Sequence, residues 1–408
     1  MNGKLAAWVL TFAAFAIVPV AVLAEKGEVV VLGLASAVLL VQAASEGTWR
    51  TAFRTPAAAI FLSLLVWALA TAAWAVSTPA ALELWKSLAL IFAAILITLN
   101  AAAHLDDAAR ARIATWAVLG LGLGLVILGI ELTFAQPLTR LIQSGNAPPR
   151  PSSLNAGVSL ALALVWPVAT AVWRRGQSKL AIGLVTGVAL IVFFCDGTSA
   201  KIAFAVALAV FVLVWTAKAR AVDILCLIAA LMVLAAPIAL RTVIPAPQTF
   251  DQSVTGAARS ALHRLYIWDF AAQHIVEKPL LGWGLDSARA LPGGKRSVLG
   301  NAPVMSLHPH NGALQIWLEL GAPGAALAAL LVLAVGGSVR RLSRGGQASN
   351  AAALFGALTI AGLSFGIWQN WWMAALGLIA VLNTALNPGQ NSGQGPDQGA
   401  ATPTDGEG

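Results

Sequence analysis

The chain has 408 residues, of which 59% are hydrophobic and only 10% are charged, whereas soluble globular proteins carry about 25% charged residues. This composition excludes an ordinary soluble domain, and two cysteines exclude a disulfide framework. The formal charge of +8 could indicate binding to a nucleic acid, but in membrane proteins basic residues gather in cytoplasmic loops and near lipid headgroups. We therefore expect an integral membrane protein whose partners include membrane lipids and no nucleic acid.

Apolar blocks long enough to cross the hydrocarbon core recur along the chain and predict an all-α protein with about twelve transmembrane helices. The first block follows Lys4 and resembles a signal peptide, but the many spans after it favour a retained signal-anchor helix. The predicted spans are 5–23, 28–44, 56–76, 86–103, 113–134, 154–173, 180–195, 199–217, 222–240, 311–335, 351–368 and 371–387.

The short connections carry basic residues unevenly. With the N-terminus inside, the inner connections hold Arg50 and Arg54, Arg110 and Arg112, Arg174, Arg175 and Lys179, Lys218 and Arg220, and Arg340, Arg341 and Arg344. The positive-inside rule then places both termini in the cytoplasm. We expect transmembrane regions over 1–240 and 311–387. The cytoplasmic tail over 388–408 is rich in Gly, Pro, Gln and Asp, and we expect it to be disordered.

Residues 241–310, between the ninth and tenth spans, predict one large extracytoplasmic loop that is partly helical, with a helix over 257–276. Structured loops that hold titratable side chains are common places for chemistry. We therefore expect the functional site here, where four of the five histidines lie: His263, His274, His308 and His310.

A histidine and an asparagine stand where this loop re-enters the membrane. His310 is a candidate base, and helix N-terminal amides nearby would suit an anion. The residue types support equally an interfacial His-Asn cap, with the polar residues Gln315 and Glu319 facing a neighbouring helix at i, i+4. A metal site at His308 and His310 is not expected, because no acidic or cysteine cluster completes it.

Basic residues form a second candidate group. Arg259 shares a helical face with His263, and Arg264 shares one with Trp268. A guanidinium suits a phosphate, although arginines that reach lipid headgroups from an interfacial helix are the better interpretation of these residues alone. Lys201 lies near the start of a predicted span, where a positive charge is unfavourable for the helix dipole. An anionic ligand or the neighbouring Asp196 would explain this lysine equally well.

These motifs resemble the O-antigen ligase family, within the wider O-antigen ligase and polymerase superfamily. The signature of that family is His-Asn, nine residues and Gly-x-x-Gly after a large periplasmic loop, and it reads here as His310-Asn311 and Gly321-Ala-Pro-Gly324. The Arg-x-x-x-Trp helix and the Pro-Leu-x-Gly-Trp-Gly turn of the family correspond to 264–268 and 279–284. The resemblance covers most of the chain in architecture, and the stretch from 264 to 324 in specific motifs.

The resemblance implies a transferase without cofactor or metal in a bacterial inner membrane, with its active site facing the periplasm. It would transfer a glycan from undecaprenyl diphosphate to a sugar hydroxyl of the lipid A core or another glycan. His310 would be the general base and Arg264 would stabilise the diphosphate. Family members commonly carry an arginine in a Ser-Arg pair just after the turn that matches 196–201. This chain departs from that pattern with Ser199-Ala-Lys201, and Lys201 could supply the positive charge instead. The residues expected to bind substrate are Arg259, Lys201, Asn311, His308, Gln315 and Glu319.

Two alternatives remain from the sequence. An O-antigen or exopolysaccharide polymerase of the same superfamily would join two lipid-linked glycans, although the complete His-Asn to Gly-x-x-Gly spacing favours the ligase. A lipid-linked glycan transporter belongs to another class of protein. Transporters tend to carry ionisable residues near the middle of their spans, whereas here the central portions are almost empty of charge, with Glu319 as the main exception. This distribution favours an enzyme over a transporter.

Overall fold

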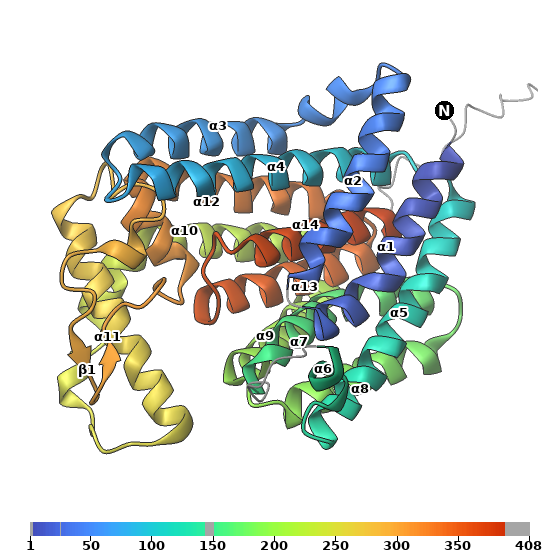
Figure 1. Ribbon diagram of the computed structural model, residues 1–408. Helices are drawn as coiled ribbons and strands as arrows, with labels where there is room; N and C mark the ends of the chain where they lie inside the picture. The colour runs from blue at the N-terminus through green and yellow to red at the C-terminus, as the bar shows by residue number, and fades with distance from the viewer. Residues whose placement is uncertain (1–2, 25, 143–150, 388–408) are drawn as a thin grey trace, which may run out of the picture.

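The structure is a computed structural model that describes residues 3–24, 26–142 and 151–387. In these ranges the regular structure is helical apart from one two-stranded hairpin (Figure 1). Nine of the described helices are long and apolar enough to cross a membrane, and two shorter apolar helices accompany them. The chain is therefore a multi-pass, all-α membrane protein, as expected. The tail predicted over 388–408 lies outside the described residues.

Each predicted span corresponds to a helix. The shorter apolar helices are α8 (Ser178–Phe194) and α14 (Asn370–Leu386), and α13 (Arg344–Leu363) is long enough but begins with the polar sequence Arg-Gly-Gly-Gln. All twelve predicted spans are therefore helical, and nine of these described helices also have the length and composition needed to cross a membrane. Those nine are α1 (Gly3–Leu23), α2 (Gly27–Ser45), α3 (Pro56–Thr71, continued by η2, Ala72–Trp74), α4 (Thr78–Ala103), α5 (Asp107–Thr133), α7 (Asn155–Trp173), α9 (Thr198–Ala217), α10 (Ala219–Val243) and α12 (Gly312–Val339).

Small residues let these helices approach closely. Helix α7 packs against α1, α5, α8, α13 and α14, and it is buried without interruption from Gly157 to Val172. A Cβ on Gly120 of α5 would lie 2.2 Å from the carbonyl oxygen of Phe15 on α1. Lipid tails are as apolar as the surfaces of these helices, so the hydrophobic effect contributes little to helix association in a bilayer. Close van der Waals packing stabilises the helix pairs instead.

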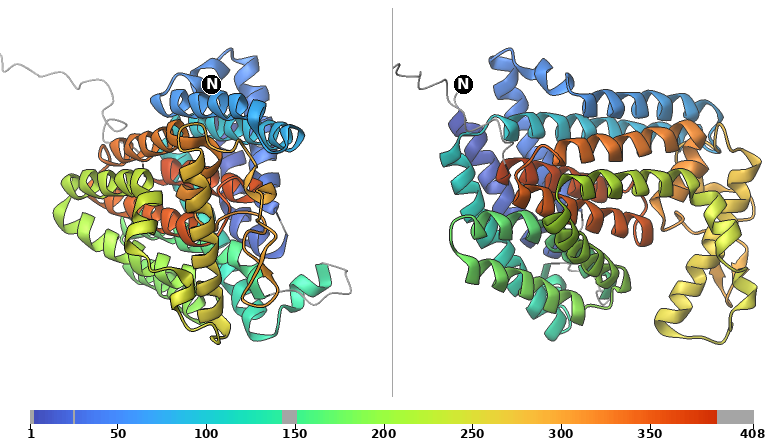
Figure 2. Two further views of the ribbon diagram at one scale, coloured as in Figure 1. Left: turned by 90° about the vertical axis from the view of Figure 1, so that its left-hand side faces the viewer. Right: turned by 180° about the vertical axis from the view of Figure 1, so that it is seen from behind.

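The large loop runs from 244 to 311 and stands at one end of the helical bundle (Figures 1 and 2). Its helix α11 (Gly256–Glu277) confirms the helix predicted over 257–276. Buried apolar residues, among them Phe270 of α11 and Leu314 of α12, form a core between the loop and the bundle. The other elements of the loop are η4 (Pro247–Thr249), η5 (Ala288–Ala290), β1 (Ser297–Val298) and β2 (Ala302–Pro303).

Connections predicted to lie on the same side of the membrane contact one another. The connection before α4 joins the large loop, where the amide of Val76 donates to Ser287 Oγ at 3.1 Å. At the other end of the bundle, Arg110 at the start of α5 donates to the carbonyl of Thr384 near the end of α14, at 2.9 Å. These contacts support the predicted alternation of the connections between two sides.

Candidate active site

Helix α12 is broken within its length. Gly321 has φ 64° and ψ −162°, a conformation essentially restricted to glycine. Pro323 follows and has no amide hydrogen to donate. The break therefore frees carbonyl groups of the preceding turn, and an unpaired carbonyl is costly wherever water is excluded.

The loop segment 279–284 provides partners for these carbonyl groups. The amide of Trp283 donates to the carbonyl of Leu318 at 2.8 Å, and the amide of Gly284 donates to that of Glu319 at 2.9 Å. Two motifs that lie far apart in the sequence therefore form a single contact in the structure. Gly284 in the segment 279–284 thus takes part in this contact through its backbone.

Glycine is needed on both sides of this contact. A Cβ on Gly282 would lie 2.5 Å from the carbonyl oxygen of Glu319, and a Cβ on Gly321 would lie 2.3 Å from that of Leu280. Both glycines also have a positive φ, of 68° and 64°. The close approach of the two backbones thus explains the glycine in each motif.

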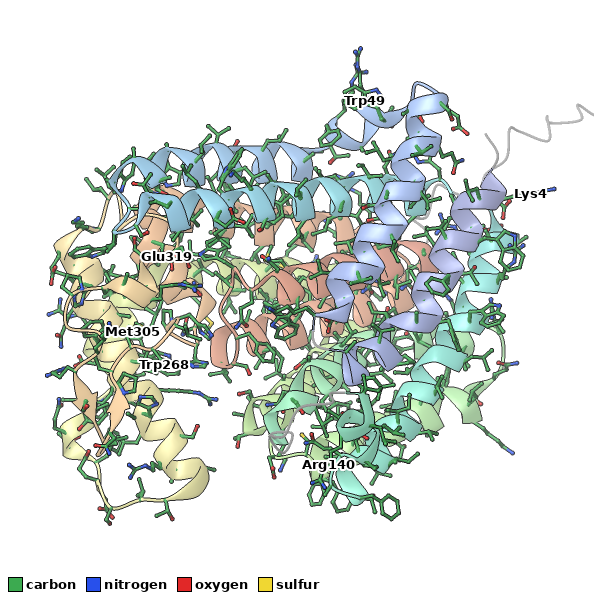
Figure 3. All side chains as sticks on the ribbon, in the orientation of Figure 1. Lys4, Trp49, Arg140, Trp268, Met305 and Glu319 are labelled. Carbon is green, nitrogen blue, oxygen red and sulfur yellow. The ribbon has the colours of Figure 1, made fainter. Side chains whose placement is uncertain are left out.

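Glu319 is fully buried, at 0% exposure, in the part of α12 that lies next to the large loop (Figure 3). Its Oε2 accepts hydrogen bonds from the amide of Asp286 and from the indole of Trp368, both at 2.8 Å. Its Oε1 accepts from Gln315 Nε2 at 3.2 Å and from the amide of Ala288 at 3.4 Å. Both carboxylate oxygens thus have protein donors, and Glu319 joins the loop, α12 and the connection between α13 and α14.

His310 is held in one orientation by a backbone carbonyl. Its Nδ1 lies 2.5 Å from the carbonyl oxygen of Ser364, at the end of α13. A carbonyl can only accept, so Nδ1 carries the proton and the neutral ring has its lone pair on Nε2. Asn311 follows and caps α12, because its side-chain oxygen accepts from the amide of Leu314 at 3.1 Å. Asn311 is therefore the predicted cap of α12, and it directly follows the candidate base His310.

His308 supports the backbone at His310. Its Nδ1 accepts a hydrogen bond from the amide of His310 at 3.2 Å, and the two ring centroids lie 4.3 Å apart. Burial lowers the pKa of His308 to about 3, with smaller contributions from His310 and Arg289. His308 is therefore neutral at physiological pH. A Cβ on Gly366 would lie 2.8 Å from its ring, so only glycine fits against it.

Helix α11 presents a row of side chains to the segment that leads to His310. Trp268 Nε1 donates to the carbonyl of Pro309 at 2.9 Å, and His263 Nε2 donates to that of Pro303 at 2.8 Å. Arg259 donates to the carbonyl of Leu299. These three residues fix the segment from 299 to 309 along the helix.

Arg264 belongs to the same helix and acts electrostatically on His310. Burial lowers the pKa of the half-buried Arg264 guanidinium. Burial is also the main reason that the pKa of His310 lies below its ordinary value. Arg264 and His263 lower this pKa further, whereas the hydrogen bond to Ser364 raises it. Arg264 and His263 of α11 therefore both act electrostatically on the candidate base.

The start of α9 reaches the same region through Ser199. Its Oγ donates to the carbonyl of Leu363 at 3.2 Å, next to the residue that holds His310. Lys201 is about 200° further round the helix. Its ammonium nitrogen lies 6.0 Å from the ring centroid of Phe193, and the side chain is exposed. Ser199, rather than Lys201, is thus the contact between α9 and this site.

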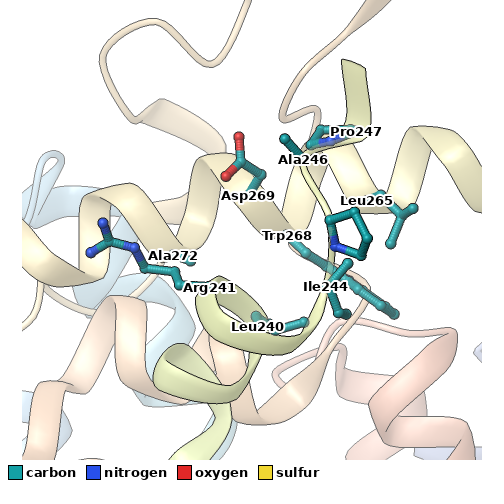
Figure 4. A pocket seen from close by; sticks show the side chains of 10 residues that line it. Leu240, Arg241, Ile244, Ala246, Pro247, Leu265, Trp268, Asp269 and Ala272 are labelled. Atoms are coloured by element: carbon teal, nitrogen blue, oxygen red, sulfur yellow. The ribbon is translucent and has the colours of Figure 1, made fainter. Parts of the chain in front are cut away.

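A cavity of about 130 Å³ lies between the end of α10 and α11 (Figure 4). Trp268 lines it, and the indole of the same residue donates to Pro309. Leu240 and Ile244 contribute apolar surface, while Arg241 and Asp269 contribute charge. Trp268 therefore both lines the cavity and contacts the segment that carries His310.

Sequence reasoning does not find the segment 364–369, which holds both His310 and Glu319. Ser364 lies 54 residues after His310, and the prediction treats this segment only as the boundary between two spans. The available signal is the sequence Trp368-Gln-Asn-Trp-Trp372, because tryptophans gather at membrane interfaces.

Comparison with known proteins gives a family for part of the chain. Residues 183–329 match the family described as O-antigen ligase. A Rickettsia conorii protein, provisionally named a polysaccharide ligase, is 35% identical over 134 residues, which are 32% of this chain and 33% of that protein. A similarly named Rickettsia typhi protein is 25% identical over 241 residues, or 58% and 59% of the two chains. The alignments thus span less than two thirds of these curated relatives.

The matched region contains α11, the segment 279–284, His310 and the break at Gly321. The motifs that carry the resemblance therefore fall within one family match, whereas Ser364 and Trp368, which contact His310 and Glu319, lie beyond it. A Rickettsia prowazekii protein with the same provisional name is 30% identical over 148 residues, covering 35% of this chain and 36% of its own length. Residues 183–329 thus match the O-antigen ligase family, and the chain is distantly similar to these rickettsial proteins.

Proposed function

We propose that the protein is a membrane glycosyltransferase of the O-antigen ligase type, which transfers a glycan from undecaprenyl diphosphate to a sugar hydroxyl of the lipid A core. The observation that carries this proposal is the arrangement of His310. Its Nδ1 donates to Ser364, so that Nε2 is the basic atom, and the Arg264 charge acts on the same ring. A positioned base that is influenced by a half-buried cation suits removal of a proton together with departure of an anion.

In the proposed reaction, His310 Nε2 accepts the proton of the acceptor hydroxyl as its oxygen attacks the anomeric carbon of the donor. A new glycosidic C–O bond forms while the bond between that carbon and the phosphate oxygen breaks. Undecaprenyl diphosphate leaves with the bonding electrons, and Arg264 stabilises its negative charge. The proton on His310 then returns to solvent, which restores the base.

The other predicted site residues take supporting roles in this proposal. The side-chain oxygen of Asn311 caps α12, which leaves its amide group to donate to an acceptor hydroxyl. Arg259 and His308 hold the backbone around the site through Leu299 and His310. Lys201 adds positive charge at the start of α9, where the lipid diphosphate would reach the protein from the bilayer.

The bilayer setting follows from the helices. The twelve predicted spans would place the loop and His310 on the periplasmic side of a bacterial inner membrane, since the basic connections gather at the opposite end. The donor lipid could then present its diphosphate at the membrane surface while its prenyl chain stays among the helices. Energy for the transfer comes from the activated sugar–phosphate bond, and this scheme uses no metal.

The test is transfer by the purified protein from undecaprenyl-diphosphate glycan, with and without lipid A core, in the presence of a chelator. We expect transfer that needs the core, survives chelation and is lost in His310→Ala and Arg264→Ala. Elongation of the lipid-linked glycan without core would replace this proposal by a polymerase. Movement of the lipid-linked glycan across the membrane of proteoliposomes, without transfer to an acceptor, would replace the proposed transferase by a transporter.

A further inference from the structure

A chain of hydrogen bonds connects buried Glu319 to the segment that holds His310. Trp368 Nε1 donates to Glu319 Oε2 at 2.8 Å. Gln315 donates to Glu319 Oε1 at 3.2 Å, and its own oxygen accepts from the amide of Ile367 at 2.9 Å. The segment 364–369 is therefore tied to α12 at two successive residues, a few positions after the carbonyl of Ser364.

We propose that Glu319, with Gln315 and Trp368, is a positioning group that holds the segment 364–369 so that the Ser364 carbonyl fixes the ring of His310. The inference rests on the proposed function of His310. It assigns these side chains to a role behind the site, through the backbone, in place of contact with substrate. None of the three is a catalytic residue in this scheme.

Two observations support an indirect role. Glu319 is 0% exposed and Gln315 is 5% exposed, so neither presents its side chain to a solvent-borne glycan. Both oxygens of Glu319 are occupied by donors from α12, the loop and Trp368. A buried carboxylate with this set of partners is suited to fixing three backbone segments relative to one another.

The position of this segment determines the tautomer of His310. With the Ser364 carbonyl in place, the Nδ1 proton is held and Nε2 is basic. When the segment moves away, the proton is free to occupy Nε2, and that tautomer cannot accept a proton from the acceptor hydroxyl. The titratable groups that act on His310 are Arg264 and His263 of α11 and the neighbouring His308, and none of them belongs to the segment 364–369.

The test compares two substitutions that each remove one indole hydrogen bond. Trp368→Phe removes the donor to Glu319, whereas the control Trp317→Phe, also next to this region, removes a donor from α12 to the carbonyl of Val233 on α10, at 2.8 Å. We expect Trp368→Phe to lower kcat about fivefold and to change the donor KM less than twofold, since a single hydrogen bond and the orientation of the base are affected. Trp317→Phe should retain the wild-type kcat.

The pH profile separates positioning from general destabilisation. The hydrogen bond to Ser364 raises the pKa of His310, so its loss should move the acidic limb of the kcat profile of Trp368→Phe to lower pH. Gln315→Leu, which releases Ile367, should shift the limb in the same direction. Glu319→Ala is less informative, because it leaves buried donors unpaired and endangers folding.

The inference is wrong if Trp368→Phe and Gln315→Leu match Trp317→Phe in kcat and in the acidic limb while His310→Ala is inactive. It is equally wrong if the two variants lose kcat with an unshifted limb. Retention of transfer by His310→Ala would instead overturn the proposed function, so the two failures are distinguishable. Thermal unfolding of every variant, measured alongside, ensures that rates are compared for folded protein.

Discussion

His310 and Ser199 donate hydrogen bonds to the carbonyl groups of two adjacent residues, Ser364 and Leu363, at 2.5 and 3.2 Å. Helix α13 ends at Leu363, so its last carbonyl groups have no helical donors. Side chains from the large loop and from α9 take their place. The end of α13 thereby connects His310 to α9, which begins more than a hundred residues before His310 along the chain.

Ser199→Ala should reduce stability by about 1 kcal/mol, because it removes one partly buried hydrogen bond. We expect kcat to fall only a few-fold, since His310 keeps its own carbonyl partner. Thermal unfolding and the transfer rate measure the two effects. Ser338→Ala, which removes an exposed hydrogen bond to Ala334 within α12, is the matched control. Complete loss of transfer in folded Ser199→Ala would show that Ser199 touches the reacting groups.

The acidic limb of the kcat/KM profile should lie below pH 6.5. Burial, Arg264 and His263 together lower the pKa of His310, so the base stays unprotonated until the pH falls below that lowered value. Arg264→Gln removes a positive charge and should therefore move the limb to higher pH, while it also weakens transfer. The exposed Arg296 of the same loop gives a control, Arg296→Gln, that should leave the limb in place. A limb that moves to lower pH in Arg264→Gln would contradict this electrostatic account.

His308 should contribute an acceptor and no proton. With a pKa of about 3 it remains neutral throughout the active range, and its Nδ1 accepts from the amide of His310. His308→Asn offers a side-chain oxygen in place of Nδ1 and should retain more transfer than His308→Leu, which leaves a buried amide unpaired. Rates of the two variants at neutral pH make the comparison. Equal rates for both would mean that this hydrogen bond does not matter to the site.

The break in α12 should tolerate no side chain. Gly321→Ala forces a Cβ into a conformation restricted to glycine and against the Leu280 carbonyl, at a cost of about 2 kcal/mol or more. We expect a clear fall in the unfolding temperature and in transfer. Gly337→Ala, on the same helix, places its Cβ in open space and should be close to neutral. If the two variants have the same unfolding temperature, the contact with segment 279–284 does not require glycine.

The sequence predicts the helices well because their signal is local. A helix predicted over 257–276 is observed as Gly256–Glu277, and the helix predicted to start at 311 begins at Gly312. Apolar block length and helical periodicity depend on neighbouring residues alone. The largest differences are at α4 and α13, which begin at Thr78 and Arg344, eight and seven residues before the predicted spans, because the first turns of both helices carry polar or charged residues.

The site itself is only half visible in the sequence. His310 and Arg264 are found because they belong to motifs, and Arg264 acts electrostatically on the ring of His310. Ser364 is missed because it takes part through its backbone carbonyl, which any residue type could supply. Glu319 is found for its charge, but its four partners come from the loop, α12 and Trp368, and such long-range pairs leave no pattern in a single sequence.

The most direct test of the central claim, that His310 is the general base, is the transfer rate of His310→Gln. Glutamine can still donate to the Ser364 carbonyl, but it cannot accept a proton at neutral pH. We expect the rate to fall by about 10² to 10⁴, the usual contribution of a positioned base. His263→Gln, which alters a histidine bonded to Pro303 in the same loop, should retain most of the rate. A His310→Gln enzyme within a few-fold of wild type would contradict the account.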